Sequence, residues 1–396
     1  MIKIGIVGTG DRGTSFVRAA EHIPEMKIEA VVDTNPIRME AVIKHHHYPP
    51  VKKFNNLDDL LDANIVDVVF ITTPDWTHSE LITKCLEKGY HVFCDKPLAI
   101  TPAQIKEILI AANKSSKMQF MGFNMRYNPL FTKLKEVTGN KDIGDILTGW
   151  CYSGYQGDGY FRRWHKFKEK SGGLIVHKGC HILDIINWMV DSYPVEVYAT
   201  GGQKVFGGNK KWPGCHECKE IETCAYARKL TDDQMKLLED IYIKAATVDG
   251  YTRNYCVFGP SDVPDHYLLI IDYASGARVI FEEIFFGTGL FYMGFAGEKG
   301  EIVTGSFIPD SIIVRKKFDR DKEKRYQVQK ETKEFHGGAD IYMLKDLIKS
   351  LETGTQILPG FKEGARSAII GVAAMISIEQ HKPVNIEQLL PIELLQ

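Results

Sequence analysis

Short apolar runs alternate with amphipathic stretches along the first third of the chain. The runs KIGIVG, KIEAVV, NIVDVVFI, YHVFC and MQFMGF have the length and composition of buried strands, whereas HSELITKCLEKG and TPAQIKEILIAANKSS have helical periodicity. Alternation of this kind is typical of a doubly wound parallel sheet. We therefore expect an α/β domain over residues 1–123.

The pattern changes in the rest of the chain, residues 124–396. The long runs VEVYATGG, DHYLLIIDYASGARVIFEEIFF, LFYMGFAGEKGEIVTG and DSIIVRKK, with turns at 273–276 and 297–300, predict a meander of antiparallel strands. The apolar run ARSAIIGVAAMISIEQ, at about 365–380, predicts a final helix that packs back between the two domains. One face of so broad a sheet would expose apolar surface, so we expect a homodimer or homotetramer.

Composition and charge limit the choice of partners. The chain has 396 residues, 44% of them hydrophobic, and its 49 basic and 51 acidic side chains give a net charge of −2. This balance gives no electrostatic reason to expect nucleic acid or a membrane as partner, and no apolar run is long enough to span a bilayer. Met1 leads directly into the first strand run without a leader, so we expect a cytoplasmic protein that acts on a small molecule.

A glycine-rich turn joins the first strand to the first helix. It reads Gly8-Thr9-Gly10-Asp11-Arg12-Gly13, a G-x-G-x-x-G motif in the strand-to-helix context of a dinucleotide site. Asp33 ends the second strand 20 residues after Gly13, the expected distance of a carboxylate that binds the adenosine ribose. This favours NAD over NADP. Arg38 lies close enough to weaken that preference, although its simpler interpretation is a solvated helix residue. For the motif as a whole, the alternative is a glycine-rich turn that binds no ligand.

Polar residues follow two further strands of the predicted parallel sheet. Ligands of such sheets bind beyond the carboxyl ends of the strands, so both segments are expected to face the cofactor cleft. The residues concerned are Thr72, Thr73, Pro74 and His78 after one strand, and Asp95, Lys96 and Pro97 after the next.

A cysteine-containing insertion is expected at about 201–260. Its cysteines are Cys215, Cys218, Cys224 and Cys256, a thiolate count that suits a structural zinc ion. An iron–sulfur cluster uses the same ligands, and His216 is an alternative to one cysteine. Free thiols and disulfides remain open, since the second pair lacks C-x-x-C spacing.

The segment GGLIVHKGCHILD, residues 172–184, carries an unusual polar stripe. His177, His181 and Asp184 are spaced i, i+4, i+7 and would share one side of a helix. Spacing alone leaves open a metal site, a proton-transfer site and a buried hydrogen-bond network. The His-x-x-x-His spacing lacks the glutamate of a zinc protease, because Lys178 stands at that position.

Several motifs together resemble one family. GTGDRG, ITTPDWTH, CDKPLAIT, GFNMRYNP and GGLIVHKGCHILD resemble, in order and spacing, those of the glucose-fructose oxidoreductase/inositol dehydrogenase/MocA-like family, over most of the chain. The resemblance implies a Rossmann domain followed by an α/β domain with a large open, mainly antiparallel sheet. It also implies NAD(P)-dependent chemistry at a secondary alcohol, commonly of a sugar or cyclitol, and an oligomer. The lysine of the family's E-K-P motif, which lies near nicotinamide and substrate, corresponds to Lys96, with Asp95 in place of glutamate.

The resemblance also assigns roles to the second motif. The family pattern G-G-x-x-x-D-x-G-x-H-x-x-D falls on this segment, so that His181 matches the catalytic histidine and His177 stands where aspartate is usual. We expect His181 to be the general acid/base and Lys96 to stabilise the developing alkoxide. His177 is expected to contact the substrate or support another residue, and Asp184 to orient the helix or its histidine.

Other residues are candidates for substrate contact. Arg163, Trp164 and His165 combine an apolar ring face with hydrogen-bond donors, although a surface loop with cation–π packing is an equal alternative. Asn124, Arg126 and Tyr127 fit either the cleft or simple interdomain packing. His336 and Asp340 are late candidates for the same pocket.

Three functional hypotheses follow. The first is an NAD-dependent dehydrogenase that oxidises a secondary alcohol of a sugar, glycoside or cyclitol. The second is a redox-neutral, NAD-dependent glycosidase or eliminase that oxidises its substrate transiently. The third is a cofactor-binding regulator without turnover, which the presence of Lys96 and His181 disfavours.

Overall fold

The N-terminal sheet has the predicted doubly wound architecture. The computed structural model describes the chain except for residues 211–213, 230, 238, 240–242, 252–254 and 329–335. Six strands lie in the order β3-β2-β1-β4-β5-β6, and every pair is parallel. The elements are β1 (Ile2–Val7), α1 (Asp11–Ala20), β2 (Met26–Val32), α2 (Pro36–His45), β3 (Lys52–Phe54), α3 (Leu57–Ala63), β4 (Val68–Ile71), α4 (His78–Glu87), β5 (His91–Cys94), α5 (Pro102–Lys114) and β6 (Gln119–Met121).

The strand order places a ligand site between β1 and β4. From β1 the chain builds outward to β2 and β3, then crosses to β4 on the other side. At such a switch point the loops after the strands separate and leave a crevice. The Gly8–Gly13 turn and residues 72–74 are the loops that follow these two strands.

Aromatic packing fixes the core of this domain. The Phe16 ring lies 5.4 Å from the Phe70 ring and 5.2 Å from the Phe93 ring, so α1 is held onto β4 and β5. Met343 and Leu344 of α13 (Ala339–Thr353) belong to the same buried cluster. A helix from the end of the chain therefore completes the cover of the N-terminal sheet.

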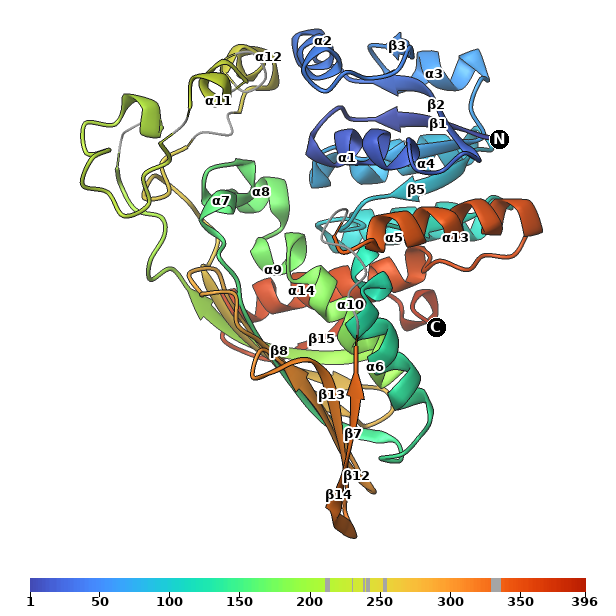
Figure 1. Cartoon of the computed structure of the whole chain (residues 1–396), viewed down its shortest axis with the longest axis vertical. Coiled ribbons are helices and arrows are strands. Elements are labelled where there is room, and N and C mark those ends of the chain that lie inside the picture. Colours follow the sequence, from blue (N-terminus) through green and yellow to red (C-terminus); the bar gives the residue numbers. More distant parts are fainter. Residues whose placement is uncertain (211–213, 230, 238, 240–242, 252–254, 329–335) are drawn as a thin grey trace.

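The second sheet is large, open and mainly antiparallel, as expected. Its nine strands lie in the order β14-β13-β12-β11-β7-β10-β9-β8-β15, and β7 and β10 form a parallel pair in it. Figure 1 shows α6 (Pro129–Gly139), α10 (Cys180–Val190) and α14 (Phe361–Gln380) together on one side of this sheet. The strands are β7 (Ile146–Gly154), β8 (Pro194–Gly202), β9 (His266–Tyr273), β10 (Arg278–Ile284), β11 (Phe291–Gly297), β12 (Gly300–Gly305), β13 (Ile308–Lys316), β14 (Asp319–Gln327) and β15 (Val384–Asn385).

The last long helix, α14, connects the two halves of the molecule. It contacts β8 and α10 on one side, and α5 and β6 on the other. Small residues permit this close fit: a Cβ at Gly371 would lie 3.0 Å from the Cα of Val176. The helix begins at Phe361, a few residues before the predicted start.

The stretch 172–184 does not form the single helix that its spacing suggested. It contains α9 (Leu174–His177) and α10, which are separated by Lys178 and Gly179. A Cβ at Gly179 would lie 2.5 Å from the carbonyl oxygen of Ile175, so the tight turn requires glycine. His177 therefore ends one short helix, whereas His181 lies in the first turn of the next.

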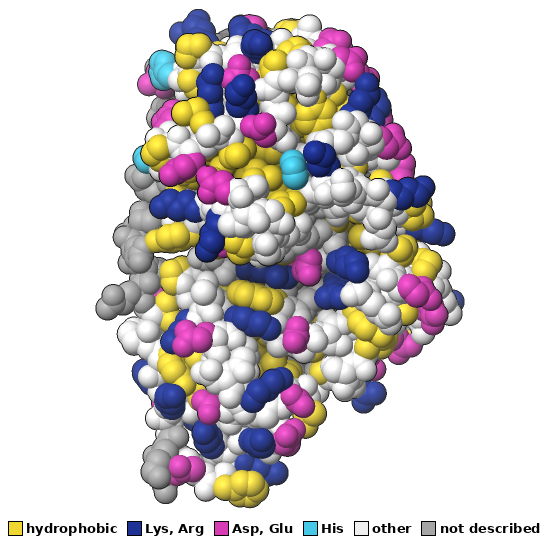
Figure 2. All heavy atoms as spheres, turned by 90° about the vertical axis from the view of Figure 1, so that its right-hand side faces the viewer, with side chains coloured by type: hydrophobic (Ala, Val, Ile, Leu, Met, Phe, Trp, Pro, Cys, Tyr) yellow, Lys and Arg dark blue, Asp and Glu magenta, His cyan; other side chains and the backbone are white. Residues whose placement is uncertain are grey.

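Short helices and an irregular insertion complete the fold. The helices are α7 (Asp158–Phe161), α8 (Lys168–Ser171), α11 (Asp232–Leu237) and α12 (Ala246–Asp249), with 3₁₀ turns at Asp75–Thr77, Asn124–Tyr127, Trp164–Lys166, Cys215–Glu217, Ile386–Gln388 and Ile392–Leu394. Within the described residues, no helix has both the length and the apolar character needed to cross a membrane. Figure 2 shows acidic and basic side chains interspersed over one face of the molecule.

Candidate active site

One cavity of about 730 Å³ joins the two halves of the protein. Its wall on one side comes from the loops after β1, β2, β4 and β5, and on the other from α9, α10 and the segment before them. Seventeen of the residues expected at the site line this cavity: Gly8, Gly10, Asp11, Arg12, Asp33, Thr72, Thr73, Pro74, Asp95, Lys96, Asn124, Arg163, Trp164, His165, His177, His181 and His336.

The glycine turn has the geometry of a phosphate-binding loop. Gly8 has φ of +97°, and a Cβ there would lie 2.9 Å from backbone atoms of Thr72 and Thr73. A Cβ at Gly13 would lie 2.2 Å from the carbonyl oxygen of Gly8. The turn can therefore place the N-terminus of α1 close to a bound anion, where backbone N–H groups and the helix dipole favour negative charge.

Asp33 is fixed at the end of β2. Its carboxylate accepts hydrogen bonds from the backbone N–H and the hydroxyl of Thr9, at 2.9 and 2.6 Å, and from the backbone N–H of Asn35 at 2.9 Å. Arg38 is not the solvated side chain that its position suggested. It is buried and forms an ion pair with Asp249 of the insertion.

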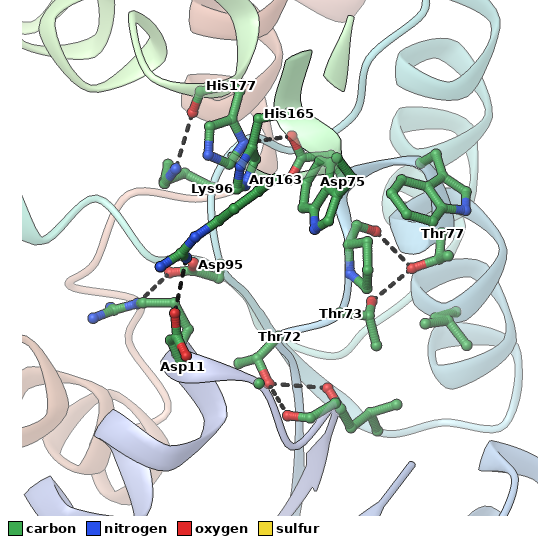
Figure 3. Close-up of a pocket in the computed structure, with 18 of the residues that line it drawn as sticks. Asp11, Thr72, Thr73, Asp75, Thr77, Asp95, Lys96, Arg163, His165 and His177 are labelled. Atoms are coloured by element: carbon green, nitrogen blue, oxygen red, sulfur yellow. Dashed lines mark hydrogen bonds and ion pairs between the residues drawn. The ribbon is translucent and has the colours of Figure 1, made fainter. Parts of the chain in front are cut away.

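His177, Lys96 and Asp75 meet at the other end of the cavity. The Lys96 ammonium donates to the carbonyl oxygen of His177 at 2.9 Å, and His177 Nδ1 lies 2.6 Å from a carboxylate oxygen of Asp75. Figure 3 shows these three residues grouped with His165, whose ring centroid is 4.1 Å from that of His177. Burial raises the pKa of Asp75 well above its usual range and lowers that of His177.

His181 faces the same cavity from the start of α10. The pKa of His181 lies well below its usual range. Desolvation by the surrounding protein is the larger cause, and the nearby ammonium groups of Lys178 and Lys96 are the smaller one. Its Nδ1 has no hydrogen-bond partner among the described residues. The imidazole is thus neutral near neutral pH and able to accept a proton.

Two ionisable groups flank this turn, a half-buried lysine and a fully buried carboxyl group. Lys178 lines the cavity, with its ammonium 4.5 Å from the centroid of the Tyr155 ring. Glu283 of β10 is fully buried close to Gly179. Burial lowers the pKa of Lys178 and raises that of Glu283.

A polar network ties the glycine turn to the start of α13. The Arg12 guanidinium lies 3.2 Å from the carboxylate of Asp95 and 3.3 Å from that of Asp340. The Asp340 carboxylate also accepts a hydrogen bond from the Asn124 side chain at 2.9 Å and lies 2.7 Å from Nδ1 of His336. Burial by itself would raise the pKa of Asp340, but His336 and Arg12 lower it to about 2. Arg163 reaches across to Asp11 at 2.9 Å, as Figure 3 shows.

Some expected site residues lie behind the cavity wall. His78 is buried and joins the loops after β4 and β5, because its ring nitrogens lie 2.8 Å from the carbonyl oxygen of Pro97 and 3.0 Å from that of Thr73. Arg126 and Asp184 form a bidentate pair at 2.8 and 2.6 Å. The expected residues that do not line the cavity are Thr9, Gly13, His78, Pro97, Arg126, Tyr127, Asp184 and Asp340.

The cavity also contains residues that the sequence reasoning missed. Asp75 directly follows Thr72-Thr73-Pro74, so its place after a strand end was available as a signal. Nothing in the sequence pointed to residues contributed by the insertion. The main additions are Asp75, Trp76, Tyr155, Tyr160, Lys178, Val248, Asp249 and Tyr251.

The cysteines of the insertion do not form the expected metal site. Within the part of the chain that the structure describes, no three His, Cys, Asp or Glu side chains gather as metal ligands. Cys215 Sγ instead accepts from the Arg162 guanidinium at 3.1 Å, and all eight cysteines are free. The structural-zinc prediction for Cys215, Cys218, Cys224 and Cys256 therefore finds no support, and the His216 side chain lies outside the described residues.

The fold and the cavity define an NAD-binding oxidoreductase architecture. Residues 2–123 match the model of the oxidoreductase family with an NAD-binding Rossmann fold, and residues 135–386 match the C-terminal alpha/beta domain of the same family. The chain therefore belongs to this glucose-fructose oxidoreductase/inositol dehydrogenase/MocA family.

Individual relatives are similar over almost the whole chain. YteT of Bacillus subtilis, named as an oxidoreductase, is 27% identical over 92% of this chain and 92% of its own. Myo-inositol 2-dehydrogenase of Thermotoga maritima is 23% identical over 98% of this chain and 100% of its own. A levoglucosan dehydrogenase solved with NADH and levoglucosan shares the fold, with a TM-score of 0.75 and 19% identity over 97% of this chain and 99% of that one.

Proposed function

We propose that this protein is an NAD-dependent dehydrogenase that oxidises a secondary alcohol of a sugar, glycoside or cyclitol. One observation carries the proposal: a single cavity contains the glycine turn, Asp33, Lys96 and His181. A dinucleotide site and a proton-transfer site are thereby continuous. The names of the relatives, an inositol dehydrogenase and a levoglucosan dehydrogenase among them, support the same substrate class.

The residues present fit a dinucleotide. The turn at Gly8 and Gly13 is so compact that a Cβ at either position would collide with backbone, which leaves room for a pyrophosphate over the N-terminus of α1. Asp33 is already held in place to receive ribose hydroxyls. A bound nicotinamide would supply the hydride acceptor. The residues proposed to hold the cofactor are Gly8, Gly10, Asp11, Arg12, Asp33, Thr72, Thr73, Pro74 and Asp95.

His181 and Lys96 are proposed to act on the substrate hydroxyl. The neutral imidazole of His181 accepts the hydroxyl proton, a step that typically contributes about 10²–10⁴ in rate. The Lys96 ammonium donates a hydrogen bond to the same oxygen and stabilises the negative charge that develops there. The carbonyl of His177 holds Lys96 at 2.9 Å, so the ammonium is positioned before a substrate arrives.

Asp75 and His177 together are proposed to replace the carboxylate of the family motif. The motif places aspartate at position 177, whereas here Asp75 brings a carboxylate to the His177 ring from the opposite wall at 2.6 Å. His177 can then present its other ring nitrogen to a second substrate hydroxyl. Trp164 and His165 lie next to it, with ring centroids 5.5 and 4.1 Å from that of His177, and offer an apolar surface to a sugar ring.

A second copy of the chain is the proposed partner of the open sheet face. Tyr198, Ile270, Ile280 and Trp150 are paired directly across β8, β9, β10 and β7, so they share one face. Their exposed fractions are 41, 45, 50 and 39%. An apolar row of this kind is typical of a subunit interface, which supports a homodimer or homotetramer.

An assay of the purified protein tests the proposal. Bound nicotinamide is measured first, and a panel of sugars, cyclitols and aryl glycosides is then screened with NAD for absorbance of NADH and for glycoside cleavage. NADH that rises with one alcohol and saturates supports the dehydrogenase. Cleavage without net NADH would favour the redox-neutral reaction, and tight sugar binding with neither product would favour a regulator.

A further inference from the structure

The insertion reaches the coenzyme domain and contributes to the cavity wall. Figure 1 shows α12 of the insertion beside α2. Asn35 at the start of α2 donates from its side-chain amide to the carbonyl oxygen of Ala245 at 2.8 Å and to the Asp249 carboxylate at 2.7 Å. Tyr251 packs edge-on against Trp76, with ring centroids 5.9 Å apart. These contacts tie residues 245–251 to two loops of the N-terminal sheet.

Asp249 brings a second carboxylate to the ribose end of the cavity. Its side chain is 10% exposed and forms an ion pair with the guanidinium of Arg38, whose side chain is 7% exposed. Asp249, Arg38 and Asp33 all line the same cavity. The cation that could blur the cofactor preference is therefore bound to a carboxylate from another part of the chain.

This arrangement matters because NADP differs from NAD by a 2′-phosphate. Rossmann domains that accept NADP offer an arginine to that phosphate, whereas those that accept NAD offer a carboxylate to the ribose hydroxyls. Here a 2′-phosphate would meet the negative charges of Asp33 and Asp249. It could bind Arg38 only by displacing Asp249 from a charge-assisted contact.

We propose that Asp249 is a specificity-determining residue that works with Asp33 to select NAD over NADP by occupying Arg38. The proposal rests on the dinucleotide site of the proposed function and extends it to a residue outside the Rossmann domain. The insertion thereby has a role in coenzyme selection that requires no metal. The negative charge of Asp249, rather than the shape of the insertion alone, excludes the 2′-phosphate of NADP.

Coenzyme binding to the full-length protein tests this proposal without any substrate. Dissociation constants for NADH and NADPH are measured by fluorescence titration for the wild type, Asp249→Ala and Asp249→Asn. We expect the wild type to prefer NADH. The ratio of the NADPH constant to the NADH constant should fall about tenfold or more in Asp249→Ala, and in the same direction in Asp249→Asn, since a charge-assisted hydrogen bond of Arg38 becomes available.

Two controls make the result specific. Glu222→Gln removes another carboxylate of the insertion, one that is exposed and paired with Lys229, and should leave the ratio unchanged. Adding Arg38→Met to Asp249→Ala should abolish the gain in NADPH binding. Thermal melts establish that each variant is folded, and the nearly isosteric Asp249→Asn serves if the alanine variant is not.

The outcomes separate this proposal from the one on which it rests. An unchanged ratio in folded Asp249→Ala or, should that variant not fold, in Asp249→Asn overturns the role of Asp249 while the dehydrogenase proposal stands. Equal affinity of the wild type for both coenzymes does the same. A wild type that binds neither coenzyme overturns the proposed function and this inference together.

Discussion

Replacing Asp184 by alanine should damage stability far more than chemistry. Asp184 matches the last position of the family motif, which led us to expect that it orients the helix or its histidine. In the structure its carboxylate accepts two hydrogen bonds from Arg126, at 2.8 and 2.6 Å, and it does not line the cavity. The side chains are 1% and 13% exposed, so the variant leaves an arginine charge buried without its partner.

The size of the effect follows from this burial. Removing one member of a buried ion pair costs about 3–5 kcal/mol, and we expect the lower end, because the Arg126 guanidinium also stacks 5.0 Å from the centroid of the Trp188 ring. At roughly 2–4 °C per kcal/mol for a cooperative unit of about 150–250 residues, a loss of about 3 kcal/mol lowers Tm by roughly 6–12 °C.

Differential scanning calorimetry and steady-state kinetics measure the two effects separately. Asp272→Ala is the matched control, since Asp272 pairs with an arginine that is 73% exposed and should cost less than about 1 kcal/mol. Below its melting temperature, Asp184→Ala should retain kcat within about threefold. If kcat instead falls by orders of magnitude while Tm stays near that of the wild type, Asp184 acts on the reaction and the reasoning is refuted.

Three further predictions concern the chemistry and the assembly. Lys96→Ala and His181→Ala should each lower kcat by about 10²–10⁴ while NADH affinity stays close to the wild-type value, and near-normal turnover in either variant would remove that residue from the mechanism. Because desolvation lowers the pKa of His181, its proton-accepting form persists below pH 6.5. We therefore expect kcat/KM for alcohol oxidation to stay constant from pH 8 to about 6.5 and to decline only in more acidic buffer. A decline of kcat/KM that begins above about pH 6.5 would argue against His181 as the base. Ile280→Lys, in the apolar row of the exposed sheet face, should shift sedimentation toward the monomer. Arg278→Lys is the conservative exposed control on the same strand, and an unchanged assembly of Ile280→Lys would place the interface elsewhere.

Much of the fold could be predicted from local patterns. The central strands of the Rossmann sheet are short and apolar, and its loops carry the glycine turn and Asp33 at fixed positions after strand ends, whereas the edge strand β3, Lys-Lys-Phe, has no such signal. Local sequence specifies these features because the turn needs glycine where a Cβ would collide with neighbouring backbone. Lys96 and His181 were placed by motif, and both line the cavity.

Other features depended on contacts between distant segments. Spacing suggested one helix through His177 and Asp184, but Gly179 breaks it, so His177 pairs with Asp75 and Asp184 with Arg126. The cysteine spacing suggested zinc, yet Cys215 contacts Arg162 instead. Spacing along the chain predicts which residues share one side of a helix or strand, but it does not predict contacts between residues of different elements.

The sequence by itself predicted the Rossmann fold, the position of the glycine turn and the two residues proposed for proton transfer, Lys96 and His181, because short-range backbone constraints and the family motifs encode them. Only the tertiary structure decided which carboxylate pairs with His177 and which one forms an ion pair with Arg38. Asp75 and Asp249 are separated from these partners by 102 and by more than 200 positions. Ion pairs of this kind form when folding brings separate elements to one cavity, and no local pattern records them.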